Sequence, residues 1–259
     1  EAPKARAFAQ PIEYAGESHG DKRVRLAKGL SDQGLASAVI TLPDSICWLL
    51  NIRGADIPKN PLVQGFAILR ADAKVDLFMA PEKCADIFDH LGEDIAVHPQ
   101  ADFVDHLARL TGTVQLNKRS CPMAVASVLT ASGVEISYGE YDPCELPKAR
   151  KNEAELKGTT EAHLRDGAAV SEFLCWFDAN CDAGITEIDV AKKLESCRMD
   201  TGQLRDISFD TISGAGPNGA VIHYRVTHDT NRTLQSGEIM VLDSGGQYVD
   251  GTTDITRVL

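Results

Sequence analysis

The chain has 259 residues, of which 43% are hydrophobic and 25% are charged, as in a globular protein of one large or two ordinary domains. The formal net charge is −12, from 26 basic and 38 acidic side chains, which excludes a protein that binds nucleic acid or an anionic membrane by general electrostatic attraction. The sequence has no apolar run of about eighteen residues, and its first ten residues lack the apolar core of a signal peptide. We therefore expect a cytoplasmic location.

The cysteines give no sign of a disulfide framework. Seven of them are scattered through the chain, and none is spaced as CxxC. We interpret them as reduced and mostly buried small hydrophobic residues, rather than as a zinc site or a redox pair.

The first part of the chain alternates between strand and helix patterns. Residues 1–13 are polar and aperiodic and are predicted to be a leader or a linker. A helix is predicted at 17–34, where Gly34 ends it, and a short helix is predicted after Asp44, which is placed to cap it. Strands are predicted at 36–42, 66–70, 75–80, 95–97, 113–116 and 134–137, and further helices around 103–110 and 123–129. This alternation predicts a layered α/β domain over residues 14–145.

A second domain is predicted from residue 146 to 259. The segment 141–153 contains two prolines and reads as a connection. Asn152 and Glu155 form a capping-box pattern before a long amphipathic helix to about residue 180, and Thr186 and Asp189 form another. Strand patterns follow at 207–214, 219–226, 238–246 and 250–258.

The most informative segment is EIMVLDSGGQYVDGTTDITR, residues 238–257. If its two strands form a hairpin centred between Tyr248 and Val249, Asp243 and Asp254 lie directly opposite one another, with Cβ atoms ~4.5–5.5 Å apart. Two carboxylates so close need a cation between them, and two divalent ions ~3.5–4 Å apart would satisfy both. Gly245 and Gly246 fit the same site, because a glycine in a strand lets another backbone or a ligand approach closely.

The same residues also allow a purely structural interpretation. Asp243 and Asp250 are consistent with the end of a strand and a turn, since acidic residues beside glycine are common there. The metal hypothesis depends on the register, because a slip of one residue places the two acids on opposite faces.

Two other segments carry candidate functional residues. The glycine-rich loop GAGPNGAVIHYR, residues 214–225, leads into a predicted strand that carries His223, which is either structural or part of the same site as the acidic hairpin. In the loop at 48–61, Arg53, Asp56 and Asn60 are consistent with a polar rim or a buried ion pair, and we favour an exposed loop.

Together these segments resemble the Xaa-Pro aminopeptidases (aminopeptidase P) of the creatinase, prolidase and methionine aminopeptidase superfamily. The resemblance runs from Tyr14 onward through WLLNIRGADIPKNP, the helix KARKNEAELKGTTEAHLRDGAAVSEFLCW, FDTISGAGPNGAVIHYR and LDSGGQYVDGTTDITR. It implies a creatinase-type α/β domain followed by the first half of a pita-bread catalytic domain.

The resemblance also implies an activity. Asp243 and Asp254 would bind two divalent metal ions, usually Mn²⁺, with Zn²⁺ or Co²⁺ as alternatives. A hydroxide bridging these ions would release the N-terminal residue from peptides with proline in the second position. His223 matches the residue that contacts the substrate and stabilises the tetrahedral intermediate, and the family implies a homodimer. A prolidase acting on dipeptides and a non-catalytic pita-bread module that binds peptides or proteins are the alternatives.

The sequence departs from the family pattern at its end. The pattern continues after the second aspartate with one His and two Glu ligands, and the sequence stops at Leu259. We therefore expect a fragment of a larger enzyme that is inactive as an isolated chain.

Overall fold

The computed structural model describes residues 3–259. The chain divides into two compact units, the first ending at Ala154 and the second spanning Glu155–Leu259. None of the helices among the described residues is long and apolar enough to cross a membrane.

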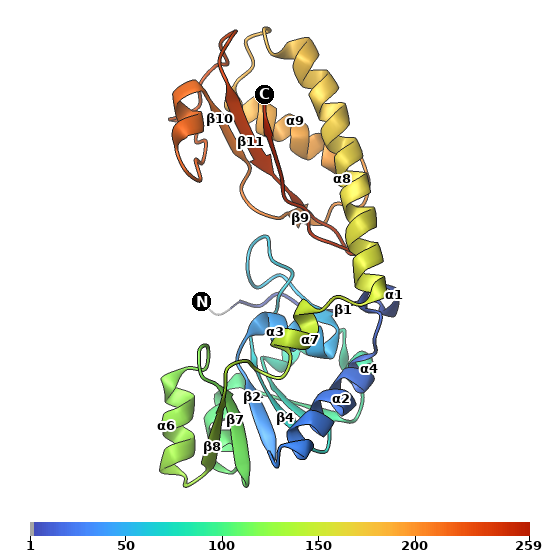
Figure 1. Cartoon of the computed structure of the whole chain (residues 1–259), viewed down its shortest axis with the longest axis vertical. Coiled ribbons are helices and arrows are strands. Elements are labelled where there is room, and N and C mark those ends of the chain that lie inside the picture. Colours follow the sequence, from blue (N-terminus) through green and yellow to red (C-terminus); the bar gives the residue numbers. More distant parts are fainter. Residues whose placement is uncertain (1–2) are drawn as a thin grey trace. The chain divides into compact units, whose positions relative to one another are not determined.

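The first unit is built on a six-stranded mixed sheet with the order β6-β5-β4-β2-β7-β8 (Figure 1). The pairs β2–β7, β5–β6 and β7–β8 are parallel, whereas β2–β4 and β4–β5 are antiparallel. The elements of this unit are β1 Phe8–Ala9, α1 Ile12–Ala15, α2 His19–Asp32, β2 Ser37–Ile40, α3 Pro43–Leu50, β3 Ile52–Arg53, β4 Phe66–Arg70, β5 Val75–Phe78, η1 Pro81–Cys84, α4 Phe88–Leu91, β6 Ile95–His98, η2 Gln100–Asp102, α5 Phe103–Ala108, β7 Thr113–Asn117, α6 Met123–Ala131, β8 Glu135–Gly139 and α7 Glu145–Ala149.

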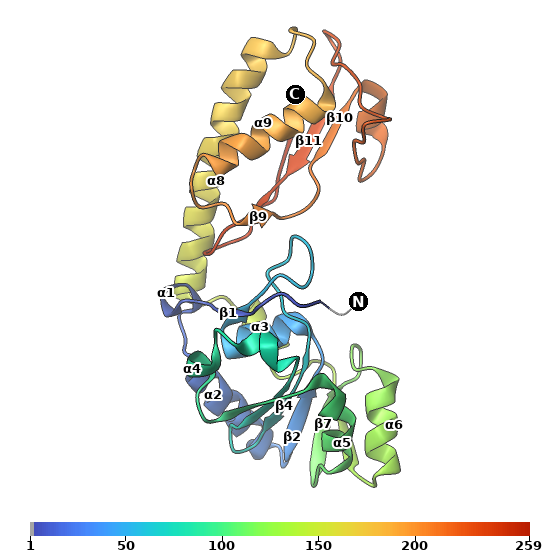
Figure 2. The ribbon, with the colours of Figure 1, turned by 180° about the vertical axis from the view of Figure 1, so that it is seen from behind.

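Both faces of this sheet are covered, which is why its central strands are apolar throughout. Ala38 and Ile40 of β2 face a core that includes α2 and α3, and Val39 between them faces a second core with α5 and α6. Figure 2 shows α5 and α6 beside β7, whereas α2 and α4 lie apart from them and pack in the core on the other face of the sheet. The predicted layered α/β arrangement of this part of the chain is confirmed.

The ends of the first helices follow local rules, with one correction. Ser18 caps α2 by accepting a hydrogen bond from the Asp21 backbone, and Gly34 follows the helix with a left-handed φ of 71°. Asp44 does not cap α3, because the helix begins at Pro43 and its N-cap is Leu42. A proline at the first helical position starts the helix one residue earlier than the expected cap.

The loop at 48–61 differs from the exposed loop that we favoured. Asp56 forms an ion pair with Lys83, and the two side chains are 0% and 5% exposed. Arg53 donates to the backbone carbonyl of Cys47 at 3.2 Å, and Asn60 is exposed. The sequence pattern did not reveal the partner of Asp56, because Lys83 lies 27 residues away.

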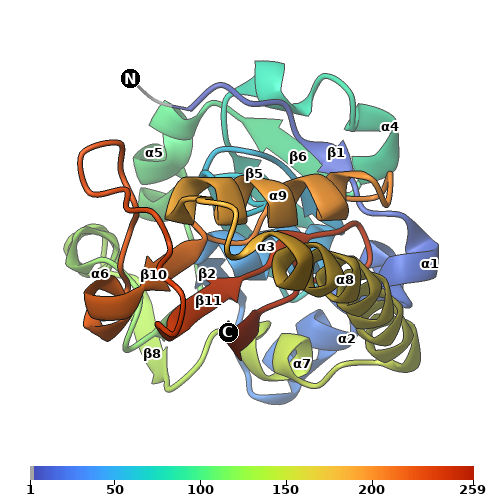
Figure 3. The same ribbon diagram turned by 90° about the horizontal axis from the view of Figure 1, so that it is seen from above.

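The second unit packs two helices against a small antiparallel sheet (Figure 3). Its core contains Val170 and Phe173 of α8, Leu194 of α9, and Met240 and Leu242 of β11. The Thr186–Asp189 capping box at the start of α9 is confirmed. The elements are α8 Glu153–Asn180, α9 Glu187–Met199, β9 Asp206–Ile207, β10 Ile212–Ala215, η3 Gly216–Ala220, β11 Met240–Ser244, β12 Gly246–Gln247 and β13 Ile255–Val258.

The predicted strand at 219–226 is wrong. This segment contains the end of η3 and a turn in which His223 has a left-handed φ of 53°. Tyr224 is buried, and its hydroxyl donates to Glu187 at 3.1 Å, whereas Ile222 is 86% exposed. The alternation of apolar residues resembled a strand, but the anchoring of Tyr224 by a distant helix favours a turn.

Candidate metal centre

The two candidate metal ligands lie on a hairpin whose register differs from the predicted one. Asp243 in β11 pairs with Thr256 in β13, and Ser244 pairs with Ile255. The hairpin is closed by a hydrogen bond from the Tyr248 backbone to Gly251, so its centre lies between Val249 and Asp250. The predicted centre lies one residue too early in the chain. Each residue of β11 therefore pairs with a residue two positions later than predicted, so that Asp243 lies opposite Thr256 and not opposite Asp254. Since side chains alternate faces with a period of two, Asp254 still shares a face with Thr256 and Asp243.

The face that carries the acids is the open face of the hairpin. Met240, Leu242 and Ser244 of β11 are buried, whereas Asp243 between them is half-buried and Asp254 is exposed. The Thr256 hydroxyl donates to Asp243 Oδ1 at 2.7 Å. Both acids therefore point away from the core of this unit.

Asp243 and Asp254 are close enough for the charge of one carboxyl group to affect the other. Partial desolvation, the negative charge of Asp243 and a hydrogen bond to Asp243 together raise the pKa of Asp254 above its ordinary value. A divalent cation would remove this repulsion, and carboxylate oxygens suit Mn²⁺.

The close approach that Gly245 was predicted to allow is confirmed. A Cβ atom on Gly245 would lie 1.9 Å from the carbonyl oxygen of Thr253 and 2.2 Å from the Ser208 hydroxyl. Only glycine fits between the two backbones at this point. The residue therefore fixes the spacing of the strands immediately beside Asp243.

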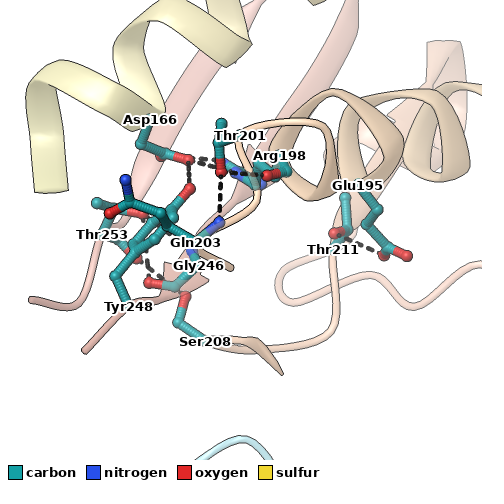
Figure 4. Close-up of polar contacts among 10 residues, drawn as sticks. All are labelled: Asp166, Glu195, Arg198, Thr201, Gln203, Ser208, Thr211, Gly246, Tyr248 and Thr253. Atoms are coloured by element: carbon teal, nitrogen blue, oxygen red, sulfur yellow. Dashed lines mark hydrogen bonds and ion pairs between the residues drawn. The ribbon is translucent and has the colours of Figure 1, made fainter. Parts of the chain in front are cut away.

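A buried polar network supports the hairpin from behind (Figure 4). The Tyr248 hydroxyl donates to Asp166 at 2.8 Å, and Arg198 Nε donates to the same carboxylate at 2.6 Å. Asp166 and Arg198 are both fully buried. Ser208 also donates to the Thr253 carbonyl at 2.9 Å. The network joins α8 and α9 to the turn that sets the register of the acids.

The turn itself is held by a second ion pair. Arg165 of α8 binds Asp250 at 2.9 Å, and the Asp250 side chain is 6% exposed. A Cβ atom on Gly158 would lie 2.5 Å from the Asp250 carbonyl, so the turn lies directly on α8. Asp250 is thus a turn residue, in agreement with the structural interpretation of that acid.

The glycine-rich loop lies against the face that carries Asp243. A Cβ on Gly219 would be 3.6 Å from the Val241 side chain, and Val241 shares its face of β11 with Asp243. Glu187 holds this loop by accepting hydrogen bonds from the Ala215 backbone at 2.8 Å and from Asn218 at 3.0 Å. His223 is exposed in the turn that follows, and within residues 3–259 it has no hydrogen bond or ion pair with either acid.

The supporting residues were not identified from the sequence. Asp166 lies in the apolar stripe of α8, among Ala162, Ala169 and Val170, and Arg198 follows Leu194 and Cys197 in α9. Charged residues in an apolar stripe are typical of buried ion pairs. The positions of Asp166 and Arg198 within apolar stripes therefore indicate buried ion pairs, but they do not show that these two residues pair with each other.

Comparison with known proteins gives the family. Residues 1–155 match the Creatinase/Prolidase N-terminal domain. The chain belongs to this family. Residues 157–259 match Metallopeptidase family M24. The expected creatinase-type domain followed by part of a pita-bread metallopeptidase domain is confirmed.

The chain is similar to fungal proteins described as probable Xaa-Pro aminopeptidase P. It is 37% identical to the protein of Talaromyces stipitatus over 98% of this chain and 40% of that protein. It is 38% identical to the protein of Talaromyces marneffei over 95% of this chain and 39% of that protein. The chain thus spans about 40% of the length of these curated relatives.

Solved structures show the same fold. The X-prolyl aminopeptidase of Caenorhabditis elegans, described as a cytosolic enzyme with a di-nuclear active site, has a TM-score of 0.89 at 30% identity and covers 98% of this chain and 43% of that one. The prolidase of Pyrococcus horikoshii has a TM-score of 0.70 at 17% identity, over 92% of this chain and 64% of that one. The second likeness concerns the fold alone.

Proposed function

We propose that this chain contributes to a metal-dependent aminopeptidase that releases the N-terminal residue from peptides with proline in the second position. The observation that carries the proposal is that the register places Asp243 and Asp254 on the same exposed face of the hairpin, within the region that matches family M24. The similarity to proteins described as Xaa-Pro aminopeptidase P supports the choice of substrate.

The donor set fits a pair of divalent ions. Asp243 and Asp254 would hold them through carboxylate oxygens, and Mn²⁺ is the ion that we propose, with Zn²⁺ or Co²⁺ as alternatives. When bound, such a pair supplies a hydroxide nucleophile at neutral pH and polarises the scissile carbonyl. Thr256 orients Asp243 through its hydroxyl, and Gly245 and Tyr248 fix the position of the strand.

His223 is proposed as a residue that contacts substrate. Its imidazole is exposed beside a loop that lies on the Asp243 face of β11. From there an N–H group of the ring would donate to the oxygen that becomes negative as the peptide bond is attacked. The hydrogen bonds of Glu187 hold this loop in place.

The aminopeptidase is favoured over the alternatives. A prolidase would use the same two acids, but the more similar relatives are described as aminopeptidases. A non-catalytic binding module has no need for two repelling carboxylates on an open face. A cytoplasmic location and a homodimer are proposed from the family resemblance.

The test measures Mn²⁺ binding and release of the first residue from a Xaa-Pro peptide. Both are measured on a longer protein that includes this chain, because we expect no turnover from the 259-residue chain alone. Asp254→Asn should abolish turnover and remove most Mn²⁺ binding, because an amide is a poor substitute for a carboxylate between cations.

The exposed Asp229, replaced by Asn, serves as the matched control and should change neither measurement. Full turnover and full metal content in Asp254→Asn would contradict the assignment of the metal centre.

A further inference from the structure

A second cluster of metal-ligating side chains lies in the first unit. Asp76, His98 and His106 each offer one ligand atom, and these atoms lie within 4.8 Å of one another. Asp76 comes from β5, His98 from the end of the edge strand β6, and His106 from α5. None of these three residues lies in the hairpin, and none has a role in the proposed aminopeptidase reaction.

The sheet register explains why these residues meet. Strands β5 and β6 are parallel, and Phe78 is paired with His98. Asp76 shares a face with Phe78, because they are two residues apart in one strand. His106 reaches the same place from α5, with its ring centroid 4.4 Å from that of His98 and 5.0 Å from that of Phe78.

The cluster has the composition and surroundings of a zinc site. A carboxylate and two imidazoles are common Zn²⁺ ligands, and a fourth position is then left for water. Phe78 and Phe103 form an apolar wall behind the ligands, with ring centroids 5.1 Å apart. The side chains of His98 and Asp76 are 24% and 13% exposed, which leaves a path for an ion.

The ligand atoms of His98 and Asp76 are close to the required spacing, and that of His106 lies within 4.8 Å of both. Tetrahedral Zn²⁺ with bonds of about 2.0–2.2 Å separates its ligand atoms by about 3.3–3.6 Å. His98 Nε2 and Asp76 Oδ1 are already 3.1 Å apart. Within residues 3–259, the His106 ring packs against Phe78 and His98 and has no hydrogen bond that would compete with an ion.

Arg70 is ion-paired with Asp76, and its positive charge disfavours the binding of a cation at this cluster. It donates to Asp76 Oδ2 through Nε at 2.8 Å, and it thereby leaves Oδ1 directed at the histidine. Its side chain is 41% exposed, so solvent screens its charge. Arg70 therefore orients the carboxylate at a moderate electrostatic cost.

We propose that Asp76, His98 and His106 bind one Zn²⁺ ion that ties the edge strand β6 and helix α5 to β5. The ion would cross-link these elements within the first unit with its fourth position open to water, and the site is independent of the proposed aminopeptidase activity.

The test uses a chain that carries Asp243→Asn and Asp254→Asn, so that the proposed aminopeptidase centre does not contribute. Calorimetric titration should show one Zn²⁺ bound per chain, and adding His106→Ala should weaken this binding by at least about 100-fold, since even residues outside the ligand set contribute 10–100-fold. His163→Ala is the matched control, because His163 is exposed and bonds only within its own helix. It should bind Zn²⁺ as before.

Two further measurements keep the test independent of folding. Zn²⁺ should raise the melting temperature of the His163→Ala chain and not that of the His106→Ala chain. In the chain with both histidines, Zn²⁺ should shift the imidazole ¹⁵N resonances of His98 and His106. No Zn²⁺ binding, equal binding after His106→Ala, or unshifted imidazole resonances would overturn the proposal.

Discussion

At the scale of single residues, His223 is the part of the proposed site that departs most from its expected setting. It lies in an exposed turn with φ of 53° and not on a strand. An exposed imidazole next to a loop held by Glu187 contributes little to packing. We therefore expect its contribution to appear in turnover and not in stability.

His223→Ala should lower kcat for a Xaa-Pro peptide by roughly 10²–10³ while Mn²⁺ content stays constant, as expected for the loss of one donor to the transition state. The neighbouring exposed His228, replaced by Ala, is the control and should retain activity. Turnover, metal stoichiometry and melting temperature are measured on one preparation of a longer protein that includes the chain. Loss of metal would instead identify His223 as a ligand, and unchanged kcat would exclude a catalytic role.

Gly245→Ala should lower the free energy of unfolding by about 1–3 kcal/mol and weaken Mn²⁺ binding, because the new methyl group forces the Thr253 backbone, and with it the adjacent Asp254, away from Gly245. Gly167→Ala is the matched control. Gly167 lies in α8 with nothing within 4 Å of its added Cβ, so alanine should stabilise the chain by about 0.5–1 kcal/mol. Urea unfolding compares the two, and equal stabilities would show that the hairpin can relax around Gly245.

At the scale of elements, the hairpin is positioned by helices and not only by its own turn. Tyr248 binds Asp166 of α8, Arg198 of α9 binds the same carboxylate, and Arg165 of α8 binds Asp250 in the turn. These contacts hold the turn between Val249 and Asp250. The register of Asp243 and Asp254 is therefore a property of three elements together.

Asp166→Asn should lower the free energy of unfolding by about 3–5 kcal/mol, because it leaves the fully buried Arg198 without a charged partner. Asp32→Asn is the control, since its pair with Lys28 is exposed and worth only about 0.3–0.5 kcal/mol. Denaturant unfolding measures both. Similar small losses in the two variants would show that water reaches Arg198.

The same pair predicts how stability depends on pH. Burial opposes ionisation of Asp166, but the hydrogen bond and charge of Arg198 outweigh it and hold the pKa of Asp166 below its ordinary value. A carboxyl group whose pKa is lower in the folded state stabilises above its unfolded pKa of about 3.9, and it loses this contribution as the pH falls toward the folded pKa. The stability difference between the unchanged chain and Asp166→Asn should therefore be largest above about pH 5. Urea titrations from neutral to acidic pH measure it, and a difference that does not shrink on acidification would contradict this assignment.

At the scale of the whole molecule, the net charge of −12 limits the partners that the surface attracts. A small peptide can still enter a local site, because such binding depends on the site and not on the total charge. The chain matches only about 40% of the length of its curated relatives, and the activity proposed here belongs to a protein with that family organisation.

The charge predicts that the chain does not bind vesicles containing phosphatidylserine at physiological salt. Cosedimentation measures this, with neutral phosphatidylcholine vesicles as the control. Binding to the anionic vesicles that disappears on adding salt would reveal a basic patch that the overall charge conceals.

The sequence by itself determined the alternating strands and helices, the capping box at Thr186, and the shared face of Asp243 and Asp254. These features depend on spacings of a few residues, and the shared face survived a register error of two because side chains alternate with that period. Only the tertiary structure decided the position of the hairpin turn, the turn that carries His223, the Asp56–Lys83 ion pair and the cluster formed by Asp76, His98 and His106. Each of these depends on which distant segment supplies the partner, and local patterns in the chain do not specify that partner.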